Sequence, residues 1–208
     1  NHSLGLIFEK QSTRTRLSFS IGMQKLGGNV IELDMKKIGF GKRESPSDIL
    51  KVMSQYLDIV MIRNNNHEQL IKLSSLNVLP IINGLSNFSH PCQILSDVFT
   101  IEENIGNIEN KKIIWMGDVN NVLVSLIQAA EIFKFDLKIL SPTSLIKKNK
   151  NIMLYKKYKY SHFSNDMNSS VKNADCVMTD VWISMGEKSI KNKKNILKKY
   201  QVNSEIMK

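Results

Sequence analysis

The chain has 208 residues, 42% of them hydrophobic, and a formal net charge of +10. No run reaches the roughly 18 apolar residues that a membrane helix needs, so we expect no membrane partner. The two cysteines, Cys92 and Cys176, fit neither a disulfide framework nor a metal site, which favours a reducing, cytoplasmic setting. The lysines between Lys147 and Lys199 come without arginine, which favours a solvated basic face over a nucleic-acid site.

Apolar runs alternate with helical patterns from the first residues to about residue 105. The pattern predicts strands at Gly5–Phe8, Asn29–Asp34, Asp58–Arg63 and Val78–Gly84. It predicts helices at Thr13–Leu26, from a cap at Ser47 or Asp48 to about Tyr56, at His67–Leu76 and at His90–Asn104. The apolar residues of the first helix are Leu17, Ile21 and Met23.

A polar, turn-rich segment at Gly106–Lys112 indicates a domain joint, and a second series of elements follows it. The pattern there predicts strands at Lys112–Val119, Asp136–Pro142, Tyr160–Ser164 and Asp175–Val181. It predicts helices at Asn121–Lys134, Lys147–Lys159, Met167–Asn173 and Lys191–Tyr200. We therefore expect two domains, residues 1–105 and 106–208.

Strand–helix alternation with nearly continuous apolar strands is typical of α/β proteins, so each domain is predicted to hold a parallel sheet flanked by helices. In such sheets ligands bind beyond the carboxyl ends of the strands. Five polar clusters fall in that predicted layer, which is the main reason to expect a functional site. They are Ser12–Arg16, Arg63, Ser86–Gln93, Asp118–Asn121 and Asp180–Gly186.

The segment Ser12-Thr13-Arg14-Thr15-Arg16 follows one strand and opens a helix. The first amides of a helix have no intrahelical partners, and the helix dipole places partial positive charge there. Hydroxyls and guanidinium groups at that point favour a phosphate site. The alternative is an ordinary Ser or Thr cap with two surface arginines.

The other clusters have plain structural alternatives. Arg63 ends a strand and could reach solvent, and His90, which shares a helix face with Gln93, could act only as a cap. The Gly117–Asn121 segment could be a simple turn, and it lacks the glycine spacing of a dinucleotide site. Asp180 could hold an ammonium group or sit in a loop anchored by Trp182.

Taken together, the segments resemble the aspartate/ornithine carbamoyltransferase family over nearly the whole chain. The matches are "STRTR" at 12–16, "HPCQ" at 90–93, "GDVNN" at 117–121 and "DVWISMG" at 180–186. The Ser-Met-Gly loop with "HPCQ" resembles the ornithine branch. The resemblance implies transfer of the carbamoyl group of carbamoyl phosphate to the side-chain amine of L-ornithine, giving citrulline and phosphate.

The resemblance also implies roles for individual residues. Carbamoyl phosphate would be bound by Ser12, Thr13, Arg14, Thr15, Arg63, His90 and Gln93. Of these, Arg63 and His90 would donate to the carbonyl oxygen and Arg14 would hold the phosphate. Ornithine would be bound by Asn121, Asp180, Ser184 and Met185. No metal or organic cofactor is implied, family members are usually homotrimers, and no nucleic-acid partner is expected.

The sequence departs from the family at three places. Asp48-Ile49-Leu50-Lys51 stands where the family usually has Asp-Thr-Ala-Arg. The family has a further helix before Gly5, and beyond Lys208 it has a His-Cys-Leu-Pro segment and a closing helix. We therefore expect either a fragment of an active enzyme or an impaired relic, with low citrulline synthesis by these residues alone.

Other readings stay open. A non-catalytic phosphate-binding α/β module would need Ser12–Thr15 but would have no use for Asp180. A carbamoyltransferase for another amine, such as aspartate or putrescine, would keep the first-domain motifs. A nucleic-acid binder is suggested by the charge alone.

Overall fold

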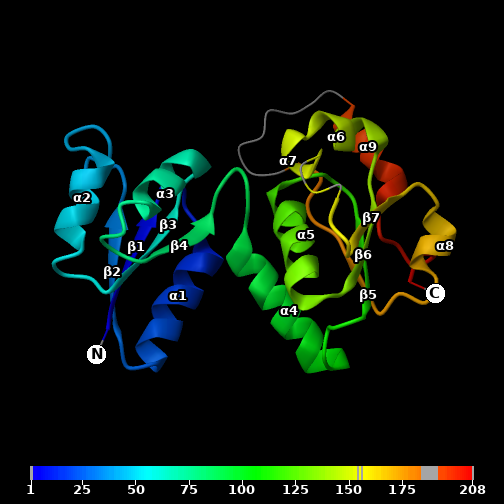
Figure 1. Cartoon of the computed structure of the whole chain (residues 1–208), viewed down its shortest axis with the longest axis horizontal. Coiled ribbons are helices and arrows are strands. Elements are labelled where there is room, and N and C mark those ends of the chain that lie inside the picture. The colour runs from blue at the N-terminus through cyan, green and yellow to red at the C-terminus, as the bar shows by residue number, and fades with distance from the viewer. Residues whose placement is uncertain (1, 154, 156, 184–191, 208) are drawn as a thin grey trace. The chain divides into compact units, whose positions relative to one another are not determined.

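The computed structural model of the chain contains two four-stranded parallel sheets with flanking helices (Figure 1). The structure describes residues 2–153, 155, 157–183 and 192–207. Contacts divide the chain into two compact units, Asn1–Cys92 and Gln93–Lys208. The two-sheet α/β architecture predicted from the sequence is therefore confirmed. The division between the units falls earlier in the chain than the joint expected near Gly106, because most of the helix that begins at Pro91 belongs to the second unit.

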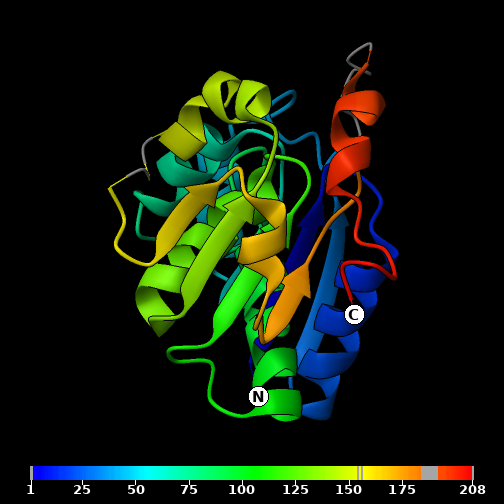
Figure 2. The same cartoon turned by 90° about the vertical axis from the view of Figure 1, so that its right-hand side faces the viewer.

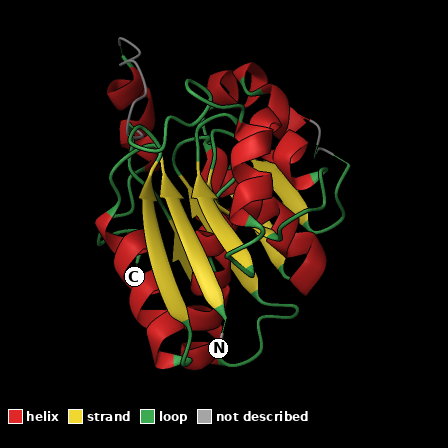
Figure 3. Cartoon of the chain, turned by 90° about the vertical axis from the view of Figure 1, so that its left-hand side faces the viewer, coloured by secondary structure: helices red, strands yellow, loops and turns green. Residues whose placement is uncertain are grey.

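The first unit has the strand order β2-β1-β3-β4, and all its arrowheads point the same way (Figure 3). Each pairing is parallel, so a helical crossover joins successive strands. Its elements are β1 (Ser3–Phe8), α1 (Thr13–Lys25), β2 (Asn29–Asp34), α2 (Pro46–Met53), β3 (Ile59–Arg63), α3 (His67–Ser74), β4 (Ile81–Leu85) and the start of α4 (Pro91–Ile105).

Alternate side chains of the central strands pack on opposite faces of this sheet, as the pleat requires. Ile7 and Ile62 face the buried residues of α2 and α3. Leu6 and Met61 face the other way, toward Phe19 of α1. The sheet therefore has helical cover on both sides, and its polar loops collect at the strand ends.

One local expectation in this unit is wrong. Ser45, rather than Ser47 or Asp48, caps α2, because its hydroxyl accepts from the Asp48 amide at 3.1 Å and Pro46 occupies the first turn. Leu17 and Ile21 of α1 are exposed, whereas Met23 of the same helix packs against the sheet.

The second unit has the strand order β7-β6-β5-β8, again all parallel (Figure 2). Its elements after α4 are β5 (Lys112–Met116), α5 (Asn121–Phe133), β6 (Asp136–Leu140), α6 (Thr143–Lys148), α7 (Lys150–Met153), β7 (Ser161–Ser164), α8 (Met167–Val171), β8 (Cys176–Met178), α9 (Lys193–Leu197) and the 3-10 turn η1 (Lys198–Tyr200). Helix α5 is deeply buried, with Leu123, Ile127 and Ala130 at 0% exposure. On the other face, Ile114 and Met116 pack with Tyr200.

The prediction of a single helix over Lys147–Lys159 is wrong. The chain forms α6 and α7 there, separated by Asn149, whose backbone is extended. The Asn149 side chain explains the break, because its Oδ1 accepts from the amides of Asn151 and Ile152 and so caps α7. None of the helices in the described part of the chain has both the length and the apolar stretch that crossing a bilayer requires.

Candidate active site

The carboxyl ends of three neighbouring strands of the first unit lie at one edge of its sheet. Phe8 at the end of β1 pairs with Arg63 at the end of β3, and Arg63 pairs with Leu85 at the end of β4. The register therefore brings the loops that follow these strands to the same edge. This is the layer in which ligands of parallel sheets bind.

Arg63 joins the first two of these loops. Its Nη1 donates to the Ser12 hydroxyl at 3.0 Å and to the Thr15 hydroxyl at 3.1 Å. Ser12 is the N-cap residue of α1, yet its side chain makes no capping hydrogen bond. The Ser12 hydroxyl, which would ordinarily cap the helix, instead accepts from Arg63. The amides of the first turn of α1 therefore remain available to bind an anion.

The two arginines of the Ser12–Arg16 segment have different surroundings. Arg16 pairs with Glu32 at 3.1 Å and lies over the Phe8 ring, 5.2 Å from its centroid, so it is part of the fold. Arg14 is exposed and near enough to Arg63 for its charge to act on that residue. Burial lowers the pKa of Arg63, and the positive charge of Arg14 lowers it further.

Arg14 and Arg63 therefore form a like-charge pair beside a helix N-terminus. Within the described ranges, no carboxylate lies within 4.0 Å of either guanidinium group. Helix α1 also has no acidic residue in its first turn. Positive charge that no carboxylate of the protein neutralises attracts a multiply charged anion. Thr13 is the first residue of α1 and is exposed at the same end.

His90 follows the third loop of this edge, directly before α4. Ser86, fully buried at 0% exposure, shapes that loop, since its hydroxyl accepts from the amides of Phe88 and Ser89. The Nδ1 atom of His90 is itself buried. The loop thus fixes the start of α4 after the strand that neighbours β3. The role of His90 as a donor to substrate stays a prediction.

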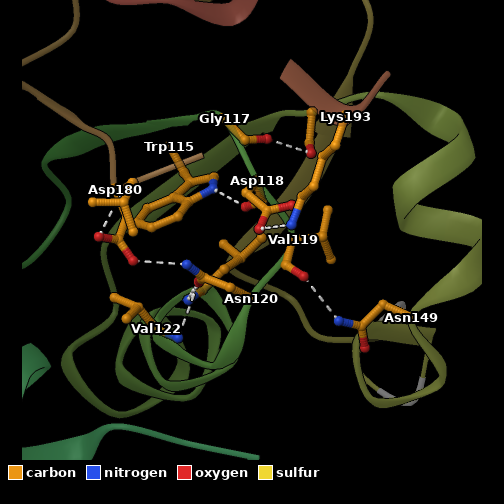
Figure 4. Close-up of polar contacts among 12 residues, drawn as sticks. Trp115, Gly117, Asp118, Val119, Asn120, Val122, Asn149, Asp180 and Lys193 are labelled. Atoms are coloured by element: carbon orange, nitrogen blue, oxygen red, sulfur yellow. Dashed lines mark hydrogen bonds and ion pairs between the residues drawn. The ribbon is translucent and has the colours of Figure 1, made fainter. Parts of the chain in front are cut away.

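In the second unit, β5 and β8 are neighbours, with Trp115 paired to Met178. The loops after them therefore meet, and Asn120 Nδ2 donates to Asp180 Oδ2 at 2.7 Å (Figure 4). The second oxygen, Oδ1, accepts from the amide of Val181 at 2.7 Å. Asn121, the residue expected to bind substrate, is the first residue of α5 and half-buried beside this pair.

Gln93 makes a contact that the sequence did not predict. Its Nε2 donates to Asp97 Oδ1 at 2.8 Å, one turn further along α4. Burial raises the pKa of Asp97, the Gln93 hydrogen bond opposes that shift, and the negative charge of Asp180 adds to it. An ionised carboxylate can only accept hydrogen bonds, so Gln93 directs its NH₂ group at Asp97. The carbonyl oxygen of Gln93 therefore faces away from Asp97.

A buried ion pair anchors the Gly117–Asn121 loop. Lys193 Nζ lies 2.7 Å from Asp118 Oδ2, and the two side chains are only 3% and 4% exposed (Figure 4). The sequence predicted Lys193 as part of a solvated basic face, and that is wrong. A lysine in a basic, Asn-rich segment gives no local signal of burial, because its partner is 75 positions away in the chain.

Two more of the predicted site residues, Ser184 and Met185, lie outside the described residues. Among the residues that the structure describes, no group of three or more His, Cys, Asp or Glu side chains could hold a metal ion. Asn120 was missed as a site residue, although its place directly before a helix is a recognisable capping signal.

The fold and the edge of the first unit's sheet at which β1, β3 and β4 end (the first edge) define a class of protein. It is a two-unit parallel α/β protein with a cationic anion site at a helix N-terminus. The model for the aspartate/ornithine carbamoyltransferase carbamoyl-P binding domain matches residues 1–103, and the model for the Asp/Orn binding domain matches residues 109–208. The chain therefore belongs to the aspartate/ornithine carbamoyltransferase family, as its motifs predicted.

Individual relatives agree with this assignment. The ornithine carbamoyltransferase of Nitrobacter winogradskyi is 42% identical over 207 residues, which cover 99% of this chain and 67% of that protein. The enzyme of the same name from Rhodopseudomonas palustris strain CGA009 is 44% identical, covering 99% and 66%.

Solved structures agree as well. The ornithine carbamoyltransferase of Burkholderia thailandensis superimposes with a TM-score of 0.86 at 36% identity, over 100% of this chain and 67% of that one. The anabolic enzyme of Campylobacter jejuni gives 0.87 at 31%, covering 100% and 71%. The chain thus spans about two thirds of the length of its relatives.

Proposed function

We propose that the protein transfers the carbamoyl group of carbamoyl phosphate to the side-chain amine of L-ornithine, giving L-citrulline and phosphate. The observation on which this proposal depends is the contact of Arg63 with Ser12 and Thr15 beside the charge of Arg14. The names of the relatives support ornithine as the acceptor.

The phosphate of the donor suits the first-unit edge. A dianion would meet the free amides of the first turn of α1, the hydroxyl groups of Ser12 and Thr15, and the guanidinium of Arg14. Thr13 would add a hydroxyl at the same end. Since within the described part of the chain no acidic side chain neutralises these cations, bound phosphate would relieve their repulsion.

The carbonyl oxygen of the donor would accept from Arg63 and His90. When the amine lone pair of ornithine attacks the carbonyl carbon, a C–N bond forms and the C=O electron pair moves onto oxygen. That oxygen gains charge, so donors aimed at it stabilise the transition state more than the substrate. Collapse breaks the C–O bond to phosphate, which leaves with its electron pair, and the proton lost by the attacking nitrogen balances the charge on the departing phosphate as HPO₄²⁻.

Groups of the second unit suit the remaining contacts. The Gln93 carbonyl oxygen, which the bond to Asp97 leaves available, can accept from the carbamoyl NH₂ group. Asp180 can bind the α-ammonium group of ornithine and Asn121 its α-carboxylate, and we assign Ser184 and Met185 to the same substrate on their motif. No metal or organic cofactor takes part in this scheme. Residues 1–105 would thus serve mainly the donor and residues 106–208 the acceptor.

The test is an assay of citrulline by the purified protein with carbamoyl phosphate and L-ornithine. We expect citrulline, formed at a low rate by residues 1–208 alone, and no carbamoylated product when L-aspartate or putrescine replaces ornithine. In calorimetry, carbamoyl phosphate should bind alone and should strengthen the binding of L-norvaline, an ornithine analogue without the reacting amine.

Three results would contradict the proposal. A product only with aspartate or putrescine would assign the protein to another amine. Binding of carbamoyl phosphate without any transfer would indicate a non-catalytic phosphate module. Salt-dependent retention on DNA without binding of carbamoyl phosphate would indicate a nucleic-acid protein.

We further propose that the protein works in the cytoplasm as a homotrimer. Neither Cys92 nor Cys176 forms a disulfide within the described residues, which is compatible with a reducing compartment. Sedimentation equilibrium would test the trimer, and a monomeric mass at working concentrations would refute it.

A further inference from the structure

We propose that Asn120 is the positioning residue for Asp180, and that the Gly117–Asn121 loop is built to hold it in that place. This inference rests on the proposed function, because the binding of the ornithine ammonium group to Asp180 is part of that proposal. It adds a residue to the acceptor site that does not itself touch the substrate.

The loop is fixed at each of its residues before Asn120. The Gly117 carbonyl accepts from the Ser141 hydroxyl at 2.6 Å, and the Asp118 carbonyl accepts from Trp115 Nε1 at 2.9 Å. The Val119 carbonyl accepts from Asn149 Nδ2 at 3.0 Å. These donors come from β5 and from the segments after β6 and α6, so the loop is held from several directions (Figure 4).

The backbone and the Asp118 side chain add to this restraint. Gly117 has a φ of 136°, a conformation that side chains disfavour and glycine adopts freely. The Asp118 carboxylate is held in the buried pair with Lys193, at 2.7 Å. Together these contacts restrain the loop on the side that precedes Asn120.

Asn120 uses both ends of its side-chain amide. The Oδ1 atom accepts from the amides of Val122 and Leu123, each at 3.1 Å, and so caps α5. The Nδ2 group then points away from the helix and donates to Asp180 Oδ2 at 2.7 Å. Because the cap fixes the oxygen, it also fixes the direction of the NH₂ group, and the amide cannot flip without losing both helix contacts.

The consequence for Asp180 is a fixed carboxylate. One oxygen accepts from Asn120 and the other from the Val181 amide, so rotation about the last side-chain bond is restrained. A carboxylate fixed before the substrate arrives loses less entropy on binding an ammonium group. A carboxylate can accept about four hydrogen bonds, so these two donors leave room for the donors of an ammonium ligand.

Three substitutions separate this role from the capping role of the same residue. Asn120→Ser keeps a good cap but cannot reach Asp180. Asn120→Ala removes both functions, and Ser141→Ala removes only one restraint on the loop. We expect Asn120→Ser to raise the KM for L-ornithine about tenfold, with the KM for carbamoyl phosphate and the melting temperature nearly unchanged. Asn120→Ala should show the same KM effect together with a lower melting temperature, and Ser141→Ala should show a smaller KM effect than either.

A second measurement is independent of activity. Hydrogen exchange of the Val181 amide, which donates to Asp180, should become faster in Asn120→Ser and stay unchanged in the exposed-site control Lys194→Ala. Unchanged exchange and an unchanged ornithine KM in Asn120→Ser would overturn the inference. If the wild-type protein made no citrulline, the proposed function would fail, whereas the exchange measurement would still decide the positioning role.

Discussion

The polar edges of the two sheets differ in how their charges are balanced. At the first edge, Arg14 and Arg63 lie near each other, and within the described residues no carboxylate pairs with either. At the second edge, Asp118 is paired with Lys193, and Asp180 receives two hydrogen bonds. The first edge is thus arranged for an anion that comes from outside, whereas the second is preorganised by contacts within the protein. Loss of a charge should therefore affect ligand binding at the first edge and folding at the second.

The strongest test of this contrast is Lys193→Met. It leaves the Asp118 carboxylate buried without its cation, which should lower the free energy of unfolding by about 3–5 kcal/mol. Urea denaturation measures this loss. The double variant Asp118→Leu/Lys193→Met should recover most of it, since no buried charge remains. A single variant as stable as the wild type would show that the second edge does not depend on its internal pair.

The matching test at the first edge is Arg63→Met. We expect kcat/KM to fall about a hundredfold or more, equivalent to about 3 kcal/mol, because a donor to the reacting oxygen is lost. The stability should change only modestly, since the loss of the hydrogen bonds to Ser12 and Thr15 is opposed by relief of the repulsion between Arg63 and Arg14.

Arg16→Met is the control for Arg63→Met, because the charge of Arg16 is already paired with Glu32. An exposed ion pair contributes about 0–1 kcal/mol, and activity should be nearly normal. Equal losses of activity in Arg16→Met and Arg63→Met would remove the distinction between the two arginines.

The smallest effect concerns Asp97→Asn. The pKa of Asp97 is raised in the folded protein above its usual 3.8, chiefly by burial. Ionisation therefore costs the folded state stability above that pKa, and the cost vanishes as pH falls to the unfolded value. The amide that replaces the carboxylate would keep an oxygen that accepts from Gln93, so Asp97→Asn should melt higher than the wild type at about pH 7. The difference should shrink toward about pH 4, and a constant difference in melting scans would contradict this explanation.

Much of the first unit follows from its sequence. Apolar runs bounded by turns indicated all four strands, and the position of Arg63 at the end of one of them placed it beside Ser12. The reason is physical: strand ends of a parallel sheet share one edge, so a residue's place in its strand predicts its neighbours in space. The Arg14 and Arg16 roles could not be separated in this way, because Glu32 lies on another strand.

The second unit was predicted less completely. The helix over Lys147–Lys159 was divided by the side chain of Asn149, whose carbonyl oxygen caps α7 and whose NH₂ group binds Val119. The burial of Lys193 likewise depends on a partner distant in sequence. Periodicity reports the environment of neighbours along the chain, and it contains no information on such long-range polar pairs.

The parallel arrangement of the strands has a consequence for the order of folding. No described strand pair can begin as a hairpin, because each pairing first requires the crossover between its strands. The central pairing of β1 with β3 encloses α1, β2 and α2, so β1 stays half-paired until Arg63 has left the ribosome. Loop closure over such distances is slow, and refolding of either unit should be much slower than that of a helical bundle of equal size.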